Sequence, residues 1–217
     1  IIHDSKNCTI KTIKVDNSKT SDGKIYVIKL KEGRMKYKVA NKHLNDYDFY
    51  MNSNFFSNVP LGEVLIDGKK VQYRSHGGGY FSTYNGEPNI NLYSRPEAKY
   101  SSQTHVIGIK NSSLNESIMH SSFARVQTYR TLLGKNSNGD LILLHSGDDG
   151  LISIKDICKL GLKEGIINGL VFDGGSSVEV KVKDGRYVHT FQSVSDIGKD
   201  VAGIHKPFTY IVGNFNN

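Results

Sequence analysis

Tryptophan is absent from the 217-residue chain, and cysteine, methionine and proline are scarce, with two, three and four residues respectively. The two cysteines, Cys8 and Cys158, lie far apart and outside any CxxC pattern, which argues against a metal site built on them. They either pair in an oxidising compartment or are two buried thiols, and we favour the thiols because nothing in the sequence brings them together. Neither is expected to be catalytic.

Long apolar runs are also missing, and no segment approaches the length that spans a bilayer, so no membrane span is expected. No signal peptide is present, and the chain begins with Ile1 rather than methionine, which favours a mature product or a part of a longer protein. Richness in Asn, Lys and Ile is typical of an AT-rich genome, such as that of a low-GC bacterium or its phage. We expect an extracellular, cell-surface or phage-associated location, with the cytoplasm left open.

Positive charge exceeds negative charge, since 28 Lys and Arg residues stand against 21 Asp and Glu residues, for a net charge of +7. Such a chain attracts anions, and nucleic acid, teichoic acid, a phosphorylated glycan and a membrane surface all have the matching sign. The lysines are scattered, however, with no long basic run and no basic segment interleaved with aromatic residues. Nucleic acid is therefore not expected as a partner.

The length suits a single domain with a core of ordinary size. Alternation of apolar and polar residues predicts many strands, and one helix is clearly marked. We expect an α/β or α+β domain with a strand-rich mixed sheet and a few packed helices. The segments predicted as strands are 9–15, 24–31, 105–109, 141–145, 166–172, 178–182, 187–191 and 208–212, with a hairpin over 64–73.

The predicted helix covers residues 154–162, with Ser153 as its N-cap and an apolar side that includes Ile157 and Cys158. Residues 94–104 and 111–122 are polar or rich in Ser and Asn, so both are predicted to be surface loops that frame a cleft.

The stretch from Asp173 to Ser177, DGGSS, directly follows the apolar strand predicted for residues 166–172. Two glycines permit positive φ and close approach of the backbone, so successive N–H groups could face one anion, with the two serine hydroxyls as further donors. The same residues would also suit a plain tight turn between two strands. Taken alone, the stretch favours the turn.

Two upstream segments change this interpretation. Met51 to Phe56 reads MNSNFF, and Tyr129 to Gly134 reads YRTLLG. With the later DGGSS, they resemble the phosphodiester glycosidase family, in which Asn-x-x-Phe-Phe, Arg-Thr-x-x-Gly and Asp-Gly-Gly-Ser segments recur in this order. One member of that family removes N-acetylglucosamine from its phosphodiester link to mannose. The resemblance covers roughly residues 48–213, and three ordered motifs are far more specific than one.

The resemblance implies a catalytic domain over residues 48–217, with residues 1–47 as N-terminal strands packed on its sheet. It implies hydrolysis of a glycosidic bond to a phosphodiester, on a phosphorylated glycan or cell-wall polymer. We assign no cofactor or metal to it, and whether a metal assists is left open. The residues matched as catalytic are Asn52, Arg130 and Asp173. Those matched as substrate-binding are Phe55, Phe56, Thr131, Gly174, Gly175, Ser176 and Ser177.

A chemical rationale accompanies these roles. Phosphate leaves as a stabilised anion, so the carboxylic acid that protonates an ordinary glycosidic leaving group is not needed. Arg130 and the donors from Gly174 to Ser177 would hold the phosphate, Asp173 would stabilise the oxocarbenium-like sugar or orient water, and Asn52 would position a hydroxyl. The sequence departs from the family at Asn54, where a small residue is usual, and an asparagine there suits a positive φ.

Several alternatives remain open. The same anion pocket could recognise a phosphate-bearing glycan or a small phosphorylated ligand without cleaving it. Glu63 and Asp67 are reserve carboxylates. The histidines His76, His189 and His205 are each expected to be exposed or structural rather than catalytic, with His205 the strongest of the three as a catalytic candidate.

Overall fold

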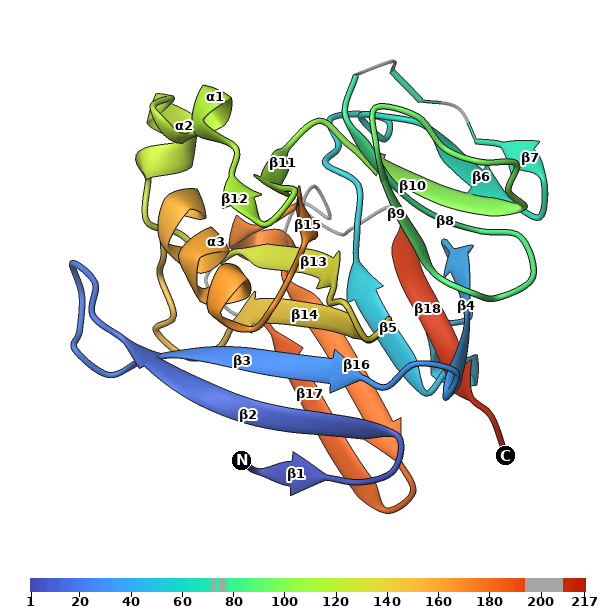
Figure 1. Ribbon diagram of the computed structural model, residues 1–217, viewed down its shortest axis with the longest axis horizontal. Helices are drawn as coiled ribbons and strands as arrows, with labels where there is room; N and C mark the ends of the chain where they lie inside the picture. The colour runs from blue at the N-terminus through green and yellow to red at the C-terminus, as the bar shows by residue number, and fades with distance from the viewer. Residues whose placement is uncertain (72, 75–76, 194–208) are drawn as a thin grey trace.

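The computed structural model describes residues 1–71, 73–74, 77–193 and 209–217. These residues form one compact domain of three antiparallel sheets with three short α-helices (Figure 1). Every strand pair within the described sheets is antiparallel, so the strand-rich single domain is confirmed and its sheets are not mixed in direction. His76 and His205 lie outside the described residues.

The first sheet has eight strands and contains the predicted strand before DGGSS. Its order is β1 (His3–Asp4), β2 (Cys8–Val15), β3 (Gly23–Leu30), β14 (Leu141–Ser146), β13 (Thr131–Lys135), β15 (Asn168–Phe172), β11 (Ile107–Lys110) and β12 (Ser113–Leu114). The helices α1 (Glu116–Met119), α2 (Ser122–Arg125) and α3 (Ile154–Lys163) gather on one side of it (Figure 1).

Two five-stranded sheets complete the domain. The second sheet has the order β7 (Lys69–Lys70), β6 (Val64–Ile66), β10 (Tyr100–Thr104), β8 (Gly79–Thr83) and β9 (Asn89–Leu92). The third has the order β17 (Tyr187–Gln192), β16 (Glu179–Asp184), β5 (Phe49–Asn52), β18 (Tyr210–Phe215) and β4 (Met35–Ala40). The N-terminal 47 residues thus supply strands to the first and third sheets.

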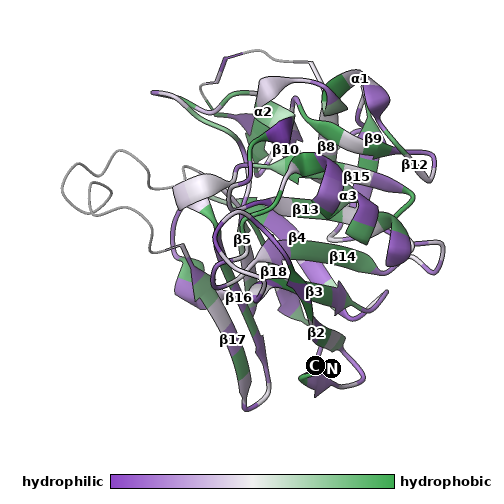
Figure 2. Cartoon of the chain, turned by 90° about the vertical axis from the view of Figure 1, so that its left-hand side faces the viewer, coloured by the Kyte–Doolittle hydropathy of each residue, from purple (hydrophilic) through white to green (hydrophobic). Residues whose placement is uncertain are grey.

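Alternation along the strands divides the core in two. On β13, Leu133 faces the cluster between the sheets, which contains Phe49, Phe81 and Phe172. Its neighbour Leu132 faces the opposite cluster, between the first sheet and the helices. Hydrophobic residues accordingly run along β13 and β14 in the middle of the molecule (Figure 2). A strand covered on both faces carries a nearly continuous apolar run, which is why β14 reads LILL.

The one predicted helix is confirmed as α3. Ser153 caps it by accepting a hydrogen bond from the backbone N–H of Asp156 at 3.1 Å, and Ile157 and Cys158 are buried against the sheet. Cys8 and Cys158 are both buried and free, as expected. The hairpin turn predicted at Asp67 and Gly68 is present, with φ of 54° and 76°.

The two predicted loops are where the sequence interpretation was wrong. Residues 100–104 of the first form β10, a strand between β6 and β8 whose residues Ser101 to Thr104 are buried. The second contains β12 and α1. Most of the buried polar side chains of β10 have partners: Thr104 Oγ1 donates to the Val171 carbonyl at 2.7 Å, the Glu63 N–H donates to Gln103 Oε1 at 2.7 Å, and the Ser102 hydroxyl donates to Asn54, whereas Ser101 Oγ has no partner among the described residues.

Candidate functional site

The backbone of Asp173 is held on three sides. Its N–H donates to the Ser53 carbonyl at 3.0 Å. Its carbonyl oxygen accepts from Asn52 Nδ2 at 2.7 Å and from Thr131 Oγ1 at 3.1 Å. Asn52 ends β5, Thr131 begins β13 and Asp173 follows β15, so the three segments singled out in the sequence meet at one peptide group. This convergence fixes the position from which the Asp173 carboxylate projects.

Both polar atoms of the Asn52 side chain have partners in the protein. The side chain is buried, its amide nitrogen bonds Asp173, and its amide oxygen accepts from the Glu179 N–H at 3.2 Å. Thr131 is likewise buried. Both side chains thus hold the backbone of the turn that carries Asp173. The substrate contacts predicted for them stay predictions.

The DGGSS turn itself uses most of its N–H groups internally. The Gly174 N–H donates to Asp173 Oδ1 at 3.0 Å, the Gly175 N–H to the Tyr129 carbonyl at 2.8 Å, and the Ser177 N–H to the Gly174 carbonyl at 3.0 Å. Three of the four N–H groups expected to face an anion are thus committed within the protein. The turn also carries the chain from β15 in the first sheet to β16 in the third.

The two glycines are required for different reasons. A Cβ on Gly174 would overlap the carbonyl oxygen of Tyr129, so only glycine fits between the turn and that backbone. Gly175 has room around it, the nearest atom to a Cβ being Thr128 Oγ1 at 3.9 Å, but its φ of 58° favours glycine.

Arg130 is a buried cation, with 3% of its surface exposed. Its Nη2 donates to the carbonyls of Phe123 at 2.9 Å and Val126 at 2.7 Å, and its Nε donates to that of Ile152 at 3.3 Å. The guanidinium carbon lies 5.1 Å from the centroid of the Phe123 ring. The guanidinium therefore ties α2 and the segment after it to the start of β13.

No carboxylate of the described residues lies within ion-pair distance of Arg130, and none of these residues accepts a hydrogen bond from its Nη1. Burial lowers the pKa of Arg130 to about 10, which still leaves it charged near neutrality. A buried charge without a counter-ion is costly, and an anionic ligand at Nη1 would offset that cost. Arg130 is thus the best candidate in the site for holding a negative group.

Aromatic side chains border Arg130. Phe55 lies edge-on to Phe123 at 5.9 Å between ring centroids and tilts against His105 at 4.9 Å. Phe123 is 46% exposed although it is large and apolar. An exposed ring beside a cation suits the apolar face of a sugar that carries a phosphate. Phe56 is half-buried, and its backbone forms an isolated antiparallel β-bridge with Pro60.

Asn54 does not have the positive φ expected for it. Its side chain is the centre of a buried network: Nδ2 donates to the Gln103 carbonyl at 2.8 Å, and Oδ1 accepts from the hydroxyls of Ser102 and Thr209, the latter at 3.0 Å. The departure from a small residue is explained by these partners rather than by backbone conformation. The network joins the Asn-x-x-Phe-Phe segment to β10 in the second sheet.

Sequence reasoning missed a histidine pair that joins β14 to β17. His145 Nε2 lies 2.9 Å from His189 Nε2, and His145 Nδ1 lies 2.9 Å from the Ser146 carbonyl. A carbonyl only accepts, so His145 carries its proton on Nδ1, and His189 donates from Nε2 to the bare Nε2 of His145. Burial, together with the charge of His189, lowers the pKa of His145 to about 3, and burial lowers that of His189 to about 4. The pair is therefore neutral near pH 7, and the structural role expected for His189 stays a prediction.

The reserve carboxylates have other roles. Glu63 forms ion pairs with Arg95 and, at 3.7 Å, with Lys70. Asp67 is exposed in the hairpin turn between β6 and β7. The three motifs meet instead at the main-chain carbonyl of Asp173.

No protein family profile matches this chain, and no curated protein matches it in sequence. Solved structures do match. The catalytic domain of zebrafish N-acetylglucosamine-1-phosphodiester alpha-N-acetylglucosaminidase, auto-inhibited by its pro-peptide, superposes with a TM-score of 0.69 at 16% identity, over 95% of this chain and 82% of that chain.

A hypothetical protein from Synechocystis superposes with a TM-score of 0.65 at 11% identity, over 98% of this chain and 63% of that one. A candidate exported protein from Burkholderia pseudomallei superposes with a TM-score of 0.58 at 10% identity, over 91% and 75% of the two chains. These identities establish a shared fold alone. No helix among the described residues is long and apolar enough to cross a membrane.

Proposed function

We propose that this chain, on a fold shared with the catalytic domain of a phosphodiester glycosidase, is itself a hydrolase of sugar-1-phosphodiesters. The observation that carries the proposal is the meeting of Asn52, Thr131 and Asp173 at one peptide group. Three separated segments that resemble one family in order thus also converge in space. The net charge of +7 and the buried charge of Arg130, which has no carboxylate partner among the described residues, suit a substrate that bears phosphate, such as a phosphorylated glycan or a cell-wall polymer.

The proposed reaction needs little acid catalysis. Water attacks C1 of the sugar, the bond between C1 and the phosphate oxygen breaks, and the phosphate departs as a monoester that keeps the bonding electrons. The Asp173 carboxylate stabilises the positive charge on the sugar ring and takes the proton of the attacking water. Arg130 faces the developing charge on phosphate through Nη1. Phe123 offers a surface for the sugar ring.

The test is the release of free reducing sugar from a panel of sugars linked through C1 to a phosphodiester or a nucleoside diphosphate. Wild type is compared with Asp173→Asn and Arg130→Ala, and the matched controls are Asp67→Asn and Arg125→Ala, which change exposed residues. We expect turnover in wild type and in both controls, with a loss of at least about a hundredfold in the two site variants.

Two outcomes would contradict the proposal. Full turnover by folded Asp173→Asn would remove that residue from the mechanism. Saturable binding of the panel by wild type without any release of sugar, lost in Arg130→Ala, would make the chain a binding module for phosphate-bearing glycans instead.

A further inference from the structure

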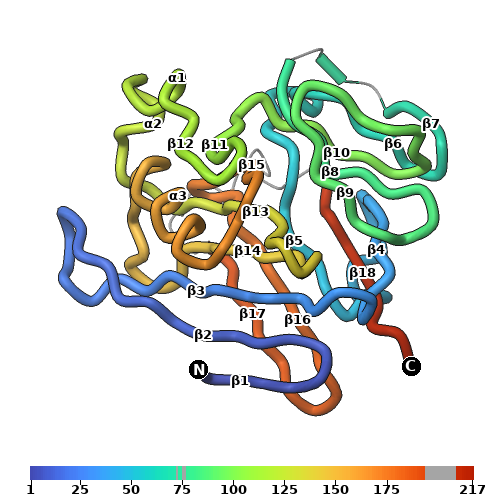
Figure 3. Tube along the Cα trace, in the orientation of Figure 1, coloured from blue at the N-terminus to red at the C-terminus, as the bar shows by residue number. Residues whose placement is uncertain are grey.

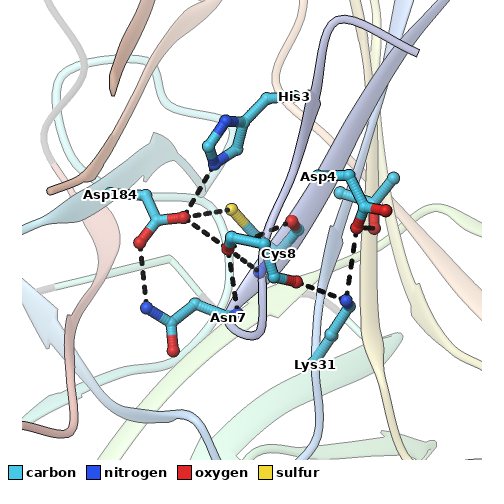
Figure 4. Close-up of polar contacts among 8 residues, drawn as sticks. His3, Asp4, Asn7, Cys8, Lys31 and Asp184 are labelled. Carbon is cyan, nitrogen blue, oxygen red and sulfur yellow. Dashed lines mark hydrogen bonds and ion pairs between the residues drawn. The ribbon is translucent and has the colours of Figure 1, made fainter. Parts of the chain in front are cut away.

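Three side chains that can bind a metal meet where the N-terminal strands approach the β16–β17 hairpin. His3 lies on β1, Cys8 begins β2 and Asp184 ends β16. Their ligand atoms, an imidazole nitrogen, a thiol sulfur and a carboxylate oxygen, all lie within 4.8 Å of one another. Figure 4 shows the three side chains pointing toward one another, and Figure 3 shows β1 beside the end of the hairpin.

We propose that His3, Cys8 and Asp184 form a binding site for a divalent metal ion of the zinc type. Imidazole, thiolate and carboxylate are the three ligand classes that zinc takes in proteins, and together they include the nitrogen and sulfur donors that magnesium and calcium avoid. The inference is independent of the proposed function, since none of these residues belongs to the site around Asp173.

The distances are close to those of a tetrahedral site. Cys8 Sγ lies 3.6 Å from Asp184 Oδ2, and His3 Nε2 lies 2.7 Å from the same oxygen. Bonds of about 2.0 to 2.3 Å from one ion to each ligand separate the ligand atoms of a tetrahedron by roughly 3.3 to 3.7 Å. The sulfur and oxygen already stand at that separation. The imidazole nitrogen must move away from Asp184 Oδ2 by less than about an ångström, and its separation from Cys8 Sγ, which lies within 4.8 Å, must come to the same range. His3 belongs to a two-residue strand near the N-terminus, which can shift that far.

The surrounding residues already orient the ligands. The His3 ring stacks on Tyr187 with centroids 4.0 Å apart and planes only 6° from parallel. Asn7 Nδ2 donates to Asp184 Oδ1 at 2.9 Å, and Ser5 Oγ donates to Asp184 Oδ2 at 2.6 Å. Such outer contacts fix the rotamers of metal ligands and contribute to affinity. The Ser5 hydroxyl or a water molecule would supply the fourth ligand.

The charge balance also suits a divalent ion. On binding, Cys8 loses its thiol proton to solvent, so that a thiolate and a carboxylate together offset the two positive charges, while His3 stays neutral. The ion replaces the hydrogen bonds through which His3 and Cys8 now contact Asp184. It would thus join the N-terminal strands to the hairpin across 176 residues of sequence between Cys8 and Asp184. That separation explains why no metal-ligand spacing marks these residues in the sequence.

The experiment uses the full chain with any histidine tag removed, stripped of metal and kept reduced, and titrates it with cobalt(II) as a spectroscopic substitute for zinc. A thiolate bound to cobalt gives a charge-transfer band in the near ultraviolet. We expect this band to saturate at one ion per chain in wild type and in Cys158→Ser, the matched control that removes the other buried free thiol.

Cys8→Ser is expected to lose the band, and His3→Ala to weaken cobalt binding by at least about tenfold. Zinc should raise the melting temperature of wild type and of Cys158→Ser, but not that of Cys8→Ser. Folding of each variant is checked by circular dichroism. A folded wild type without the band, or a band that survives in Cys8→Ser, would overturn the proposal.

Discussion

The side-chain amide of Asn52 donates to the main-chain carbonyl of Asp173 at 2.7 Å, across 121 residues of sequence. Thr131 donates to the same oxygen from another strand. The role expected for Asn52 from the sequence was to position a substrate hydroxyl. The contacts show that it positions the turn that carries Asp173, and its direct contact with substrate stays a prediction.

Asn52→Asp therefore tests positioning. A carboxylate in place of the amide can no longer donate to the Asp173 carbonyl and would repel it, at a cost of about 2 kcal/mol in the free energy of unfolding. We expect kcat to fall while KM stays nearly constant, because the ligand-facing groups remain. Thr131→Val, which removes the second donor with little change of shape, is the comparison. Equal loss of stability without any change in kcat would make Asn52 purely structural.

The two glycines of the turn should respond differently to alanine. Gly174→Ala places a methyl group against the Tyr129 carbonyl, which cannot yield, so the turn and Asp173 must move. We expect a loss of several kcal/mol and of turnover. Gly175→Ala meets no close atom and adds only the strain of positive φ, about 1 to 2 kcal/mol. Denaturant unfolding and turnover measure both. A greater loss of stability and turnover in Gly175→Ala than in Gly174→Ala would show that Gly174 does not lie against the Tyr129 carbonyl.

Arg130→Lys keeps the charge but loses the planar group that reaches three carbonyls. A lysine ammonium is a point donor, so α2 and the segment after it would lose anchoring contacts, and we expect unfolding to become easier by about 3 kcal/mol. A sugar 1-phosphate should raise the melting temperature of wild type and of the exposed-site control Arg125→Lys, but not of Arg130→Lys. If the sugar 1-phosphate raises the melting temperature of Arg130→Lys as much as that of wild type, its phosphate binds elsewhere.

The His145–His189 pair predicts the response of stability to acid. Both folded-state pKa values, about 3 and about 4, lie below the ordinary value of 6.5, so the unfolded chain takes up protons that the folded chain refuses. Stability is therefore fully present above about pH 6.5 and falls as the pH drops toward 4, by up to about 1.4 kcal/mol per pH unit for each histidine.

Denaturant unfolding at pH 7, 6 and 5 measures this slope. Replacing both histidines by leucine removes both hydrogen-bonding partners together and should flatten the slope, whereas His120→Gln, at an exposed helix end, should leave it unchanged. A double variant with the slope of wild type would assign the acid sensitivity to carboxylates instead.

Local patterns in the sequence were sufficient for α3 and for strands such as β2, β3 and β14, because an N-cap serine, a period of two or a short continuous apolar run is visible within a few residues. They failed at β10, whose row of Ser, Gln and Thr looks like a loop. Its burial depends on partners such as Asn54 and Val171, which lie about fifty residues or more away.

For the site, too, the sequence located the segments but not the hydrogen bonds that each residue makes. The resemblance to a family singled out segments that prove to be neighbours in space, but the use of each donor could not be read from residue types. Gly175 and Ser177 satisfy carbonyls of Tyr129 and Gly174, which only the folded turn reveals. The roles assigned to the motif residues in catalysis and substrate binding stay predictions.

The carbonyl of Asp173 accepts one hydrogen bond from β5 of the third sheet and another from β13 of the first sheet. The orientation of one carboxylate thus depends on how two sheets lie against each other. The apolar layer between them, which includes Phe49 and Phe172, then serves as an alignment layer for the site as well as a source of stability. Loosening this layer would disturb the Asp173 carboxylate before the domain unfolds, and the proposed activity would then be a more sensitive measure of core packing than the melting temperature.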